Sequence, residues 1–348
     1  MTYPQLRTSL LIITLLTITL LLLTNRSPLS LSPHNLSHPP PTTANESTTI
    51  PNIVNLVHLL DPTSPTPTDL TFEFSQYLSV YAAFHHLHPP TILLHTDASA
   101  LAISRARAGH SGKWTRLLLE MPGLVIKDVV RPDVTSMGSV IGPMEHKSDF
   151  VRVEALREVG GLYIDFDVFV LRSLRSLFDA GFGAVVGREF TDDINSGAFL
   201  TRPHGELITA WADDMPRFYD GSWLRHSNYA LTSIAERLVG EASGDVLIME
   251  RNAFAPGGWE PQDLDRLWAV HDEGDGEDVS WPVDWSRTYL LHAFMPYRNK
   301  HPVHGFDRVD PRYVLERRSN FARALYPLVS MMEEKGLVER NDTFDGRE

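Results

Sequence analysis

The chain contains no cysteine, which excludes disulfides, thiol nucleophiles and zinc–thiolate clusters and leaves the redox compartment undefined by composition. Positive charge is also scarce: 31 lysines and arginines stand against 44 aspartates and glutamates, for a formal net charge of −13. That balance argues against an electrostatic grip on nucleic acid, so we expect no nucleic-acid partner. With 348 residues, the chain is long enough for one large domain or two small ones.

One long apolar run is present, at residues 8–24, where 17 residues rich in Leu and Ile carry no charge. Arg7 precedes this run and Arg26 follows it. The length predicts a transmembrane signal anchor, with residues 1–7 as a cytoplasmic tail. A cleaved signal peptide is the alternative, although no small-x-small cleavage site follows Leu23.

Residues 25–51 are rich in Pro, Ser and Thr, a composition that cannot form a packed core and is typical of an extended spacer. Asn-x-Ser sequons occur at Asn25, Asn35 and Asn45. An anchor followed by such a stem predicts a single-pass type II membrane protein of the Golgi, with its catalytic domain in the lumen. We expect that domain to span residues 52–335 and residues 336–348 to form a flexible tail.

The globular part alternates strand-like and helix-like segments, which predicts an α/β fold. Predicted strands lie at residues 53–60, 91–95, 124–130, 183–187 and 198–201. Predicted helices lie at residues 70–87, with Asp69 as N-cap, at 114–119, 147–159 and 312–335, and from Glu206 and Tyr229 onward. Residues 272–278 are predicted to form a solvated loop.

The most informative segment is residues 146–170, which ends in an Asp-Phe-Asp triplet inside an apolar run. If this run is a strand, Tyr163, Asp165 and Asp167 share one face because side chains alternate along a strand. Two neighbouring carboxylates at the end of a buried strand are costly unless they are neutralised. A divalent cation with oxygen ligands is the usual means, so the triplet predicts a metal–diphosphate site.

Asp149 and Arg152 lie three residues apart on the preceding predicted helix and therefore share a face. A surface ion pair of little energetic value is one interpretation. Their position just before the acidic triplet favours another, in which the carboxylate binds sugar hydroxyls and the guanidinium binds a phosphate oxygen.

The segment KSDFVRVEALREVGGLYIDFDVFVLRSL resembles the DXD-containing sugar-binding region of glycosyltransferase family 32 and its relatives. These include α-1,4-galactosyltransferases, α-1,4-N-acetylglucosaminyltransferases, fungal mannosyltransferases and clostridial glucosylating toxins. The resemblance implies a GT-A-like, Rossmann-related nucleotide-sugar-binding domain with a mixed, mainly parallel sheet and helical C-terminal additions.

The resemblance also implies roles for individual residues. Asp149 and Arg152 would contact the donor sugar and its phosphate, and Tyr163 would line the sugar pocket. Asp165 would contact the ribose or the sugar of the donor, and Asp167 would ligate Mn²⁺ or another divalent cation.

Two weaker matches lie further along the chain, at NSGAFLTRPHGELITAW and TYLLHAF. The first places Asn195 near the reaction centre, so the implied catalytic set is Asp165, Asp167 and Asn195. The second places His292 where a C-terminal histidine completes the metal site. A strand-end histidine bonded locally is the alternative for His292.

The implied reaction is metal-dependent transfer of a sugar from a nucleotide-sugar donor to a hydroxyl of a glycan or glycolipid, with retention of the α configuration. UDP-galactose, UDP-N-acetylglucosamine and GDP-mannose are all open as donors. Two alternatives remain: a catalytically inactive sugar-binding relative, and a phosphatase with Asp165 as nucleophile and Asp167 as acid.

Several other polar and aromatic residues have simpler interpretations. The histidines at positions 85, 86 and 88 are interpreted as surface residues rather than metal ligands. The acidic group Glu189, Asp192 and Asp193 is interpreted as a solvated loop, with a catalytic carboxylate as the alternative. Tryptophans are expected in the core or a pocket wall, and Trp259 is also a candidate acceptor platform.

Overall fold

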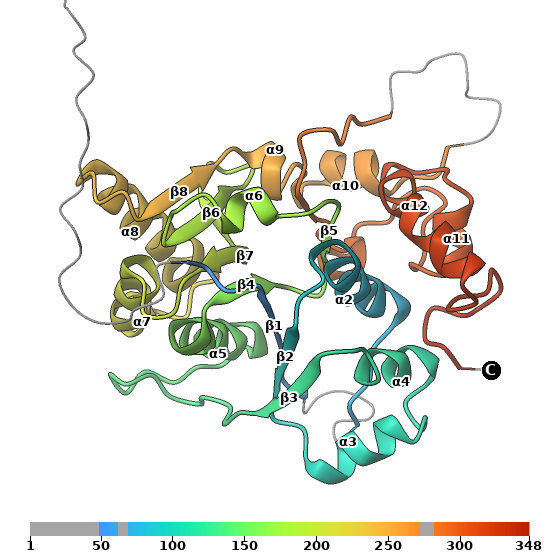
Figure 1. Ribbon diagram of the computed structural model, residues 1–348, viewed down its shortest axis with the longest axis horizontal. Helices are drawn as coiled ribbons and strands as arrows, with labels where there is room; N and C mark the ends of the chain where they lie inside the picture. Colours follow the sequence, from blue (N-terminus) through green and yellow to red (C-terminus); the bar gives the residue numbers. More distant parts are fainter. Residues whose placement is uncertain (1–48, 62–68, 272–281, 348) are drawn as a thin grey trace, which may run out of the picture. The chain divides into compact units, whose positions relative to one another are not determined.

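The computed structural model describes residues 49–61, 69–271 and 282–347, all within one compact unit, Ser47–Glu348 (Figure 1). The predicted anchor, most of the predicted stem and the predicted loop at residues 272–278 lie outside the described residues. Among the helices of the described part, none combines the length and apolar character needed to cross a bilayer.

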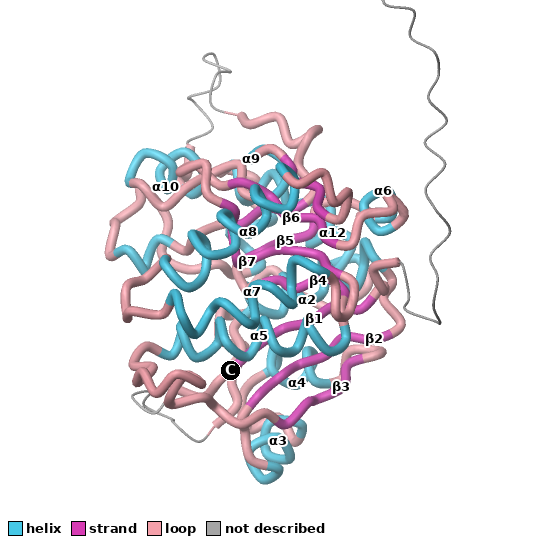
Figure 2. The backbone as a smooth tube through the Cα atoms, turned by 90° about the vertical axis from the view of Figure 1, so that its left-hand side faces the viewer, coloured by secondary structure: helices cyan, strands magenta, loops and turns pink. Residues whose placement is uncertain are grey.

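The described residues form a sheet of seven strands in the order β3-β2-β1-β4-β7-β6-β8 (Figure 2). The strands in sheet order are β3 (Leu124–Asp128), β2 (Thr91–Thr96), β1 (Ile53–His58), β4 (Gly161–Ile164), β7 (Ile194–Thr201), β6 (Ala184–Arg188) and β8 (Val246–Met249). Only the pairings of β7 with β4 and with β6 are antiparallel within this sheet. The predicted mixed, mainly parallel α/β sheet is confirmed.

Helices cover both faces of the sheet, and the alternation of side chains along each strand explains why (Figure 1). Leu56 belongs to the core that also includes α2 and α12, whereas its neighbour Val57 belongs to the core that includes α5, α7 and α8. In the same way Leu162 and Tyr163 of β4 point to opposite faces. The central strands are thus buried on both sides, which makes the sheet a rigid support for the residues at its strand ends.

The helices of the described residues, in chain order, are α2 (Phe74–Leu87), α3 (Ala100–Arg107), α4 (Lys113–Leu119), α5 (Met144–Val159), α6 (Arg175–Phe178), α7 (Glu206–Phe218), the π-helix η1 (Arg225–Tyr229), α8 (Ala230–Gly240), α9 (Arg251–Phe254), α10 (Pro261–Trp268), the 3-10 helix η2 (Pro296–Asn299), α11 (Pro311–Leu315) and α12 (Asn320–Glu334). A second, two-stranded ladder joins β5 (Val168–Val170) to β9 (Leu290–His292).

The predicted strands and the long helices are confirmed, with boundaries that differ by a few residues. The predicted N-cap Asp69 is wrong: α2 begins at Phe74, and the Gln76 side chain accepts a hydrogen bond from the Glu73 backbone at 2.8 Å. The C-terminal helical region predicted at residues 312–335 is confirmed and consists of two helices, because Asp310 and Ser319 each cap a separate start.

The residues after α12, predicted as a flexible tail, make specific contacts with α4. Lys113 Nζ lies 2.6 Å from Asp342 Oδ2, and Trp114 Nε1 donates to the Thr343 carbonyl at 2.8 Å. The Lys113 backbone donates to the Gly346 carbonyl at 2.9 Å. The chain end therefore packs on the N-terminal half of the fold.

Candidate active site

The acidic triplet lies in a turn that follows β4, and this corrects the prediction that all of it continues the strand. Strand β4 ends at Ile164, and the Val168 backbone donates to the Asp165 carbonyl at 3.0 Å to close the turn. Because apolar residues flank the turn on both sides, the sequence pattern does not reveal where the strand ends. Gly161 starts β4 at φ +103°, and a Cβ there would collide with the Ile53 backbone, so the entry to this strand requires glycine.

The turn places Asp167 beside His292, which comes from a strand more than a hundred residues away in sequence. Val168 of β5 pairs with His292 of β9, and His292 Nε2 lies 3.3 Å from Asp167 Oδ1. Ligand atoms of Asp165, Asp167 and His292 all lie within 4.8 Å of one another. Within the described residues these three form the one group of this kind. We call them the cation end of the site.

Gly197 of β7 leaves the space into which the cation end converges. A Cβ at this position would lie 2.7 Å from Asp165 Oδ2 and 2.7 Å from His292 Cε1. The Gly197 carbonyl also accepts a hydrogen bond from the Asp165 backbone at 2.8 Å. Any side chain here would displace two candidate ligands, so the glycine keeps the metal position open.

Electrostatics at the cation end favour a bound cation. Burial raises the pKa of Asp165 above its usual value, although Arg152 opposes this shift. Burial alone would lower the pKa of His292, but Asp167 and Asp165 outweigh it and raise that pKa. A raised pKa for a carboxyl group, and a raised pKa for the imidazole beside it, both indicate that the negative charge here lacks sufficient positive charge nearby. Two carboxylate oxygens and an imidazole nitrogen are suitable ligands for Mn²⁺ or a similar divalent cation.

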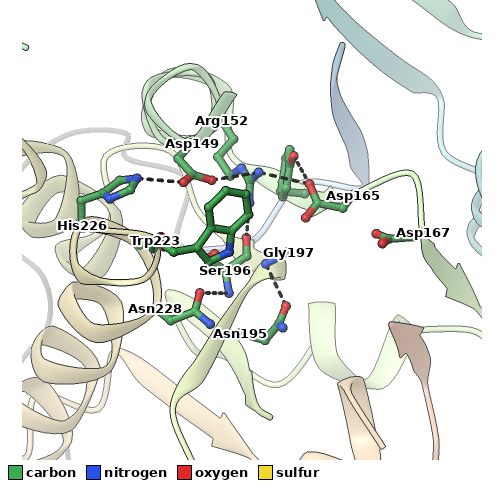
Figure 3. Close-up of polar contacts among 12 residues, drawn as sticks. Asp149, Arg152, Asp165, Asp167, Asn195, Ser196, Gly197, Trp223, His226 and Asn228 are labelled. Atoms are coloured by element: carbon green, nitrogen blue, oxygen red, sulfur yellow. Dashed lines mark hydrogen bonds and ion pairs between the residues drawn. The ribbon is translucent and has the colours of Figure 1, made fainter. Parts of the chain in front are cut away.

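The other end of the site is built on α5, and we call Asp149, Arg152 and His226 the arginine end (Figure 3). Arg152 lies 3.0 Å from Asp149 Oδ1 and 3.2 Å from Asp165 Oδ1, so it joins the two ends. It also donates to the Ser196 carbonyl at 3.0 Å. Burial opposes its charge, but Asp165 and the other neighbouring groups outweigh burial and raise its pKa, so the guanidinium stays protonated.

His226 completes the arginine end, and no motif in the sequence points to it. Its Nε2 lies 2.9 Å from Asp149 Oδ2, and its side chain is fully buried. His226 packs against His146 and Phe150 of α5, with ring centroids 4.5 Å and 5.9 Å apart. The surface ion pair considered for Asp149 and Arg152 is therefore wrong, because both residues are buried.

Tyr163 contacts the site through its hydroxyl, which donates to Asp165 Oδ1 at 2.6 Å. Its ring is 1% exposed, and the Arg152 guanidinium lies 4.6 Å from the ring centre. Tyr163 therefore helps to hold the side chains of Asp165 and Arg152 in place.

Asn195, predicted near the reaction centre, lies beside His292, with its Oδ1 3.1 Å from His292 Nδ1. Of the acidic group predicted as a solvated loop, Asp192 is exposed but Glu189 is fully buried and contacts Asn195. For Glu189 the solvated-loop interpretation is wrong, because its burial comes from distant residues, among them Asn228.

Aromatic residues flank both ends of the site. Trp223 is 58% exposed and packs on His146 at 5.3 Å between ring centroids. Trp259 packs on Phe294, which stacks on His292 at 3.9 Å. Trp211 and Trp268 are core residues, as expected.

A third aromatic group lies at the end of β1, next to the acidic turn. His58 packs against Phe72 at 4.6 Å and against Phe166, the middle residue of the triplet, at 5.8 Å. Burial lowers the pKa of His58 to about 4, so this imidazole is neutral near pH 7.

Residues 124–182 match the family model described as the glycosyltransferase sugar-binding region containing the DXD motif. This range includes Asp149, Arg152, Tyr163, Asp165 and Asp167 and ends before Asn195 and His292. The resemblance to DXD-motif glycosyltransferases is confirmed.

The chain is similar to glucan organizing enzyme 1 of Cryptococcus neoformans var. grubii, with 21% identity over 300 residues, 82% of this chain and 72% of that protein. Among solved structures, the galactosyltransferase LgtC in complex with donor and acceptor sugar analogues has 13% identity and a TM-score of 0.41, covering 82% of this chain and 100% of that one. Mouse xyloside xylosyltransferase 1 has 12% identity and a TM-score of 0.39, covering 70% and 97%. The motif match supports glycosyltransferase activity for this chain.

Proposed function

We propose that this chain is a metal-dependent glycosyltransferase that moves a sugar from a nucleotide-sugar donor to a hydroxyl of a glycan or glycolipid. The main support is the convergence of Asp165, Asp167 and His292 on one point beside Arg152, in a segment that matches the DXD sugar-binding region. UDP-galactose, UDP-N-acetylglucosamine and GDP-mannose are the candidate donors.

Asp165, Asp167 and His292 would hold the divalent cation, with Mn²⁺ as the first candidate. When bound, such a cation supplies positive charge against the donor diphosphate and so favours departure of the nucleotide. The neutral His58 and the neighbouring Phe166, both packed on the buried Phe72, offer a stacking surface for the nucleotide base at the same end of the sheet.

The arginine end would bind the donor sugar. Arg152 holds one oxygen each of Asp149 and Asp165, which leaves carboxylate capacity to accept hydrogen bonds from sugar hydroxyls. Because Arg152 is only 5% exposed, its main effect would be to orient these two carboxylates. Trp223, exposed beside this end, would present an apolar face to a sugar ring of the acceptor.

For the stereochemistry we propose retention of the α configuration, with attack on the face from which the nucleotide leaves. Asp165 Oδ1 accepts a hydrogen bond from Tyr163 and forms an ion pair with Arg152, an arrangement that lowers its nucleophilicity. The same contacts weigh against a phosphatase in which Asp165 is the nucleophile. Product NMR tests the proposal: an α-linked product supports retention, and a β-linked product from an α-linked donor contradicts it.

The cellular setting remains part of the proposal: a type II Golgi membrane protein with residues 8–24 as anchor, residues 25–51 as stem and the catalytic domain in the lumen. Fractionation of cells that express the tagged full-length chain tests it. Carbonate-resistant membrane association and glycosylation at Asn35 or Asn45 are expected, and a soluble, unglycosylated chain would contradict the assignment.

The activity itself is tested by nucleotide release from a panel of UDP- and GDP-sugars, with glucan among the acceptors because the Cryptococcus relative is named for glucan organisation. Release from one donor, dependent on Mn²⁺ and abolished by EDTA, is expected. If a folded chain neither releases nucleotide from any donor nor binds nucleotide with Mn²⁺, the inactive-relative alternative gains support.

A further inference from the structure

Glu189 is a fully buried carboxylate in the connection from β6 to β7, outside the set of groups that would touch donor or cation. Its neighbours Thr191 and Asp192 are exposed, so its burial is not a property of the whole connection. A buried carboxylate costs free energy unless donors satisfy it. Its partners therefore indicate what it does.

Three side chains donate to Glu189. Asn195 Nδ2 lies 2.6 Å from Oε2, Asn228 Nδ2 lies 3.0 Å from Oε1, and Thr191 Oγ1 lies 3.1 Å from Oε1. An ionised carboxylate can only accept hydrogen bonds. Both asparagines must consequently turn their NH₂ groups toward Glu189 and their oxygens away from it.

The oxygen of Asn195 then faces the cation end. It accepts a hydrogen bond from the Gly197 backbone at 2.8 Å, and it lies 3.1 Å from His292 Nδ1. An amide oxygen cannot donate, so the contact with His292 requires a proton on Nδ1. The other ring nitrogen, Nε2, is the one that points to Asp167. With Nδ1 protonated, Nε2 of the neutral ring has a lone pair for a metal ion.

The oxygen of Asn228 supports the opposite end of the site. It accepts from the Ser196 backbone at 3.2 Å, and the Ser196 carbonyl in turn accepts from Arg152. Glu189 thus has two arms: one through Asn195 to His292, and one through Asn228 and Ser196 to Arg152 (Figure 3 shows the contacts of Asn195, Asn228 and Ser196).

We propose that Glu189 is a positioning residue that orients the Asn195 amide and thereby fixes the His292 tautomer in which Nε2 is free to bind the divalent cation. This inference rests on the proposed metal-dependent function, and it adds a residue outside the ligand set. Partners of this kind orient metal-bound histidines in proteins, and their loss typically costs about 10–100-fold in metal affinity.

The test is Mn²⁺ binding to the purified full-length chain, followed by electron paramagnetic resonance, in wild type and Glu189→Gln. Glutamine offers one oxygen and one NH₂ group, so it cannot accept from both asparagines. We expect the Kd for Mn²⁺ to rise about 10–100-fold. Glu236→Gln is the matched control: it removes a half-exposed carboxylate whose partner is Arg188, and the Kd should not change.

A second readout separates positioning from general destabilisation. With ¹⁵N-labelled histidine in metal-free protein, above the pKa of His292, the wild type should show His292 protonated on Nδ1. Glu189→Gln and Asn195→Ala should both shift it toward the Nε2-protonated form. Asn228→Ala, which breaks only the other arm, should leave the His292 tautomer and the Mn²⁺ affinity unchanged.

The outcomes distinguish the two levels of the account. Tight Mn²⁺ binding and an unchanged His292 tautomer in both Glu189→Gln and Asn195→Ala would overturn the role of Glu189 while leaving the metal site intact. Absence of Mn²⁺ binding by the wild type would contradict the proposed function, whatever the tautomer measurement shows.

Discussion

The two ends of the site differ in how far their charges are balanced within the protein. At the arginine end, Asp149 lies within 3.0 Å of both Arg152 and His226, and Arg152 has Asp149, Asp165 and the Ser196 carbonyl as partners. At the cation end, Asp165 and Asp167 converge on His292. Across both ends, three carboxylates face a single guanidinium when His292 is neutral.

This difference assigns different tasks to the two ends. At the arginine end the opposite charges of Arg152 and Asp149 are already paired in the ligand-free protein, so this end contributes to folding and holds carboxylates ready for a sugar. The cation end has an excess of negative charge that a divalent ion would neutralise, so its two carboxylates should lower the stability of the fold until a ligand binds.

The largest expected effect comes from removing the guanidinium of the arginine end. Arg152→Met would leave the buried Asp149 and the partly buried Asp165 without their cation, so we expect the free energy of unfolding to fall by about 3–5 kcal/mol in EDTA. Denaturant unfolding measures this change. Arg237→Met, which removes an exposed ion pair with Glu241, serves as control and should change stability little. An Arg152 variant as stable as the wild type would contradict the structural role of this end.

Removing a negative charge from the cation end should not lower the free energy of unfolding of the ligand-free protein. Asp167→Asn takes away one of the converging carboxylates, so the variant should be at least as stable as the wild type in EDTA. Because Asp167 would hold the cation that stabilises the leaving nucleotide, nucleotide release with Mn²⁺ should fall by roughly 10²–10³-fold, the range found when one group that stabilises developing charge is lost. If the variant kept full Mn²⁺-dependent release, Asp167 would not be a ligand.

The raised pKa of His292 gives a smaller effect that depends on pH. A raised pKa means that the folded state binds the proton more tightly than the unfolded state. The resulting stability is fully present below the usual histidine pKa of 6.5 and is lost as pH rises through the raised value. In EDTA, the stability advantage of wild type over His292→Asn should therefore shrink with rising pH. An advantage that is constant or grows with pH would contradict this charge assignment.

The smallest effect is expected for Trp223, the exposed aromatic residue beside the arginine end. Trp223 is largely exposed, so Trp223→Ala should leave unfolding unchanged. If the indole stacks on the acceptor, KM for the acceptor should rise several-fold, by an amount equivalent to roughly 1 kcal/mol, while KM for the donor stays constant. Steady-state kinetics with each substrate varied in turn decides this. A rise in KM for the donor alone would indicate that Trp223 contacts the donor and not the acceptor.

The order of strands and helices was predictable because apolar periodicity reports burial on one or both faces. The Asp-Phe-Asp turn was not, because the residues on either side of it, Ile164 and Val168, are as apolar as a continuous strand. Strand β9 was also missed: three residues give no periodicity, and the strand exists because it pairs with β5.

Within the site, residues that touch a ligand were easier to predict than residues that support them. Asp165, Asp167 and His292 were identified by motif, and the structure brings them together. Glu189 was interpreted first as part of a solvated loop and His226 was not singled out, because each has a partner far away in sequence and polar residues in loops and helices are usually solvated. The same reason explains the chain end, where Asp342 and Thr343 contact α4.

The most direct test of the difference in charge balance between the two ends is pulsed electron paramagnetic resonance of Mn²⁺ bound to the full-length chain. We predict one bound ion with a nitrogen coupling from His292. His292→Asn should abolish the coupling, Asp167→Asn should prevent binding, and Trp223→Ala should leave both unchanged. A bound ion without nitrogen coupling, or one retained with full affinity in Asp167→Asn, would show that the excess negative charge at the cation end serves some purpose other than holding a metal.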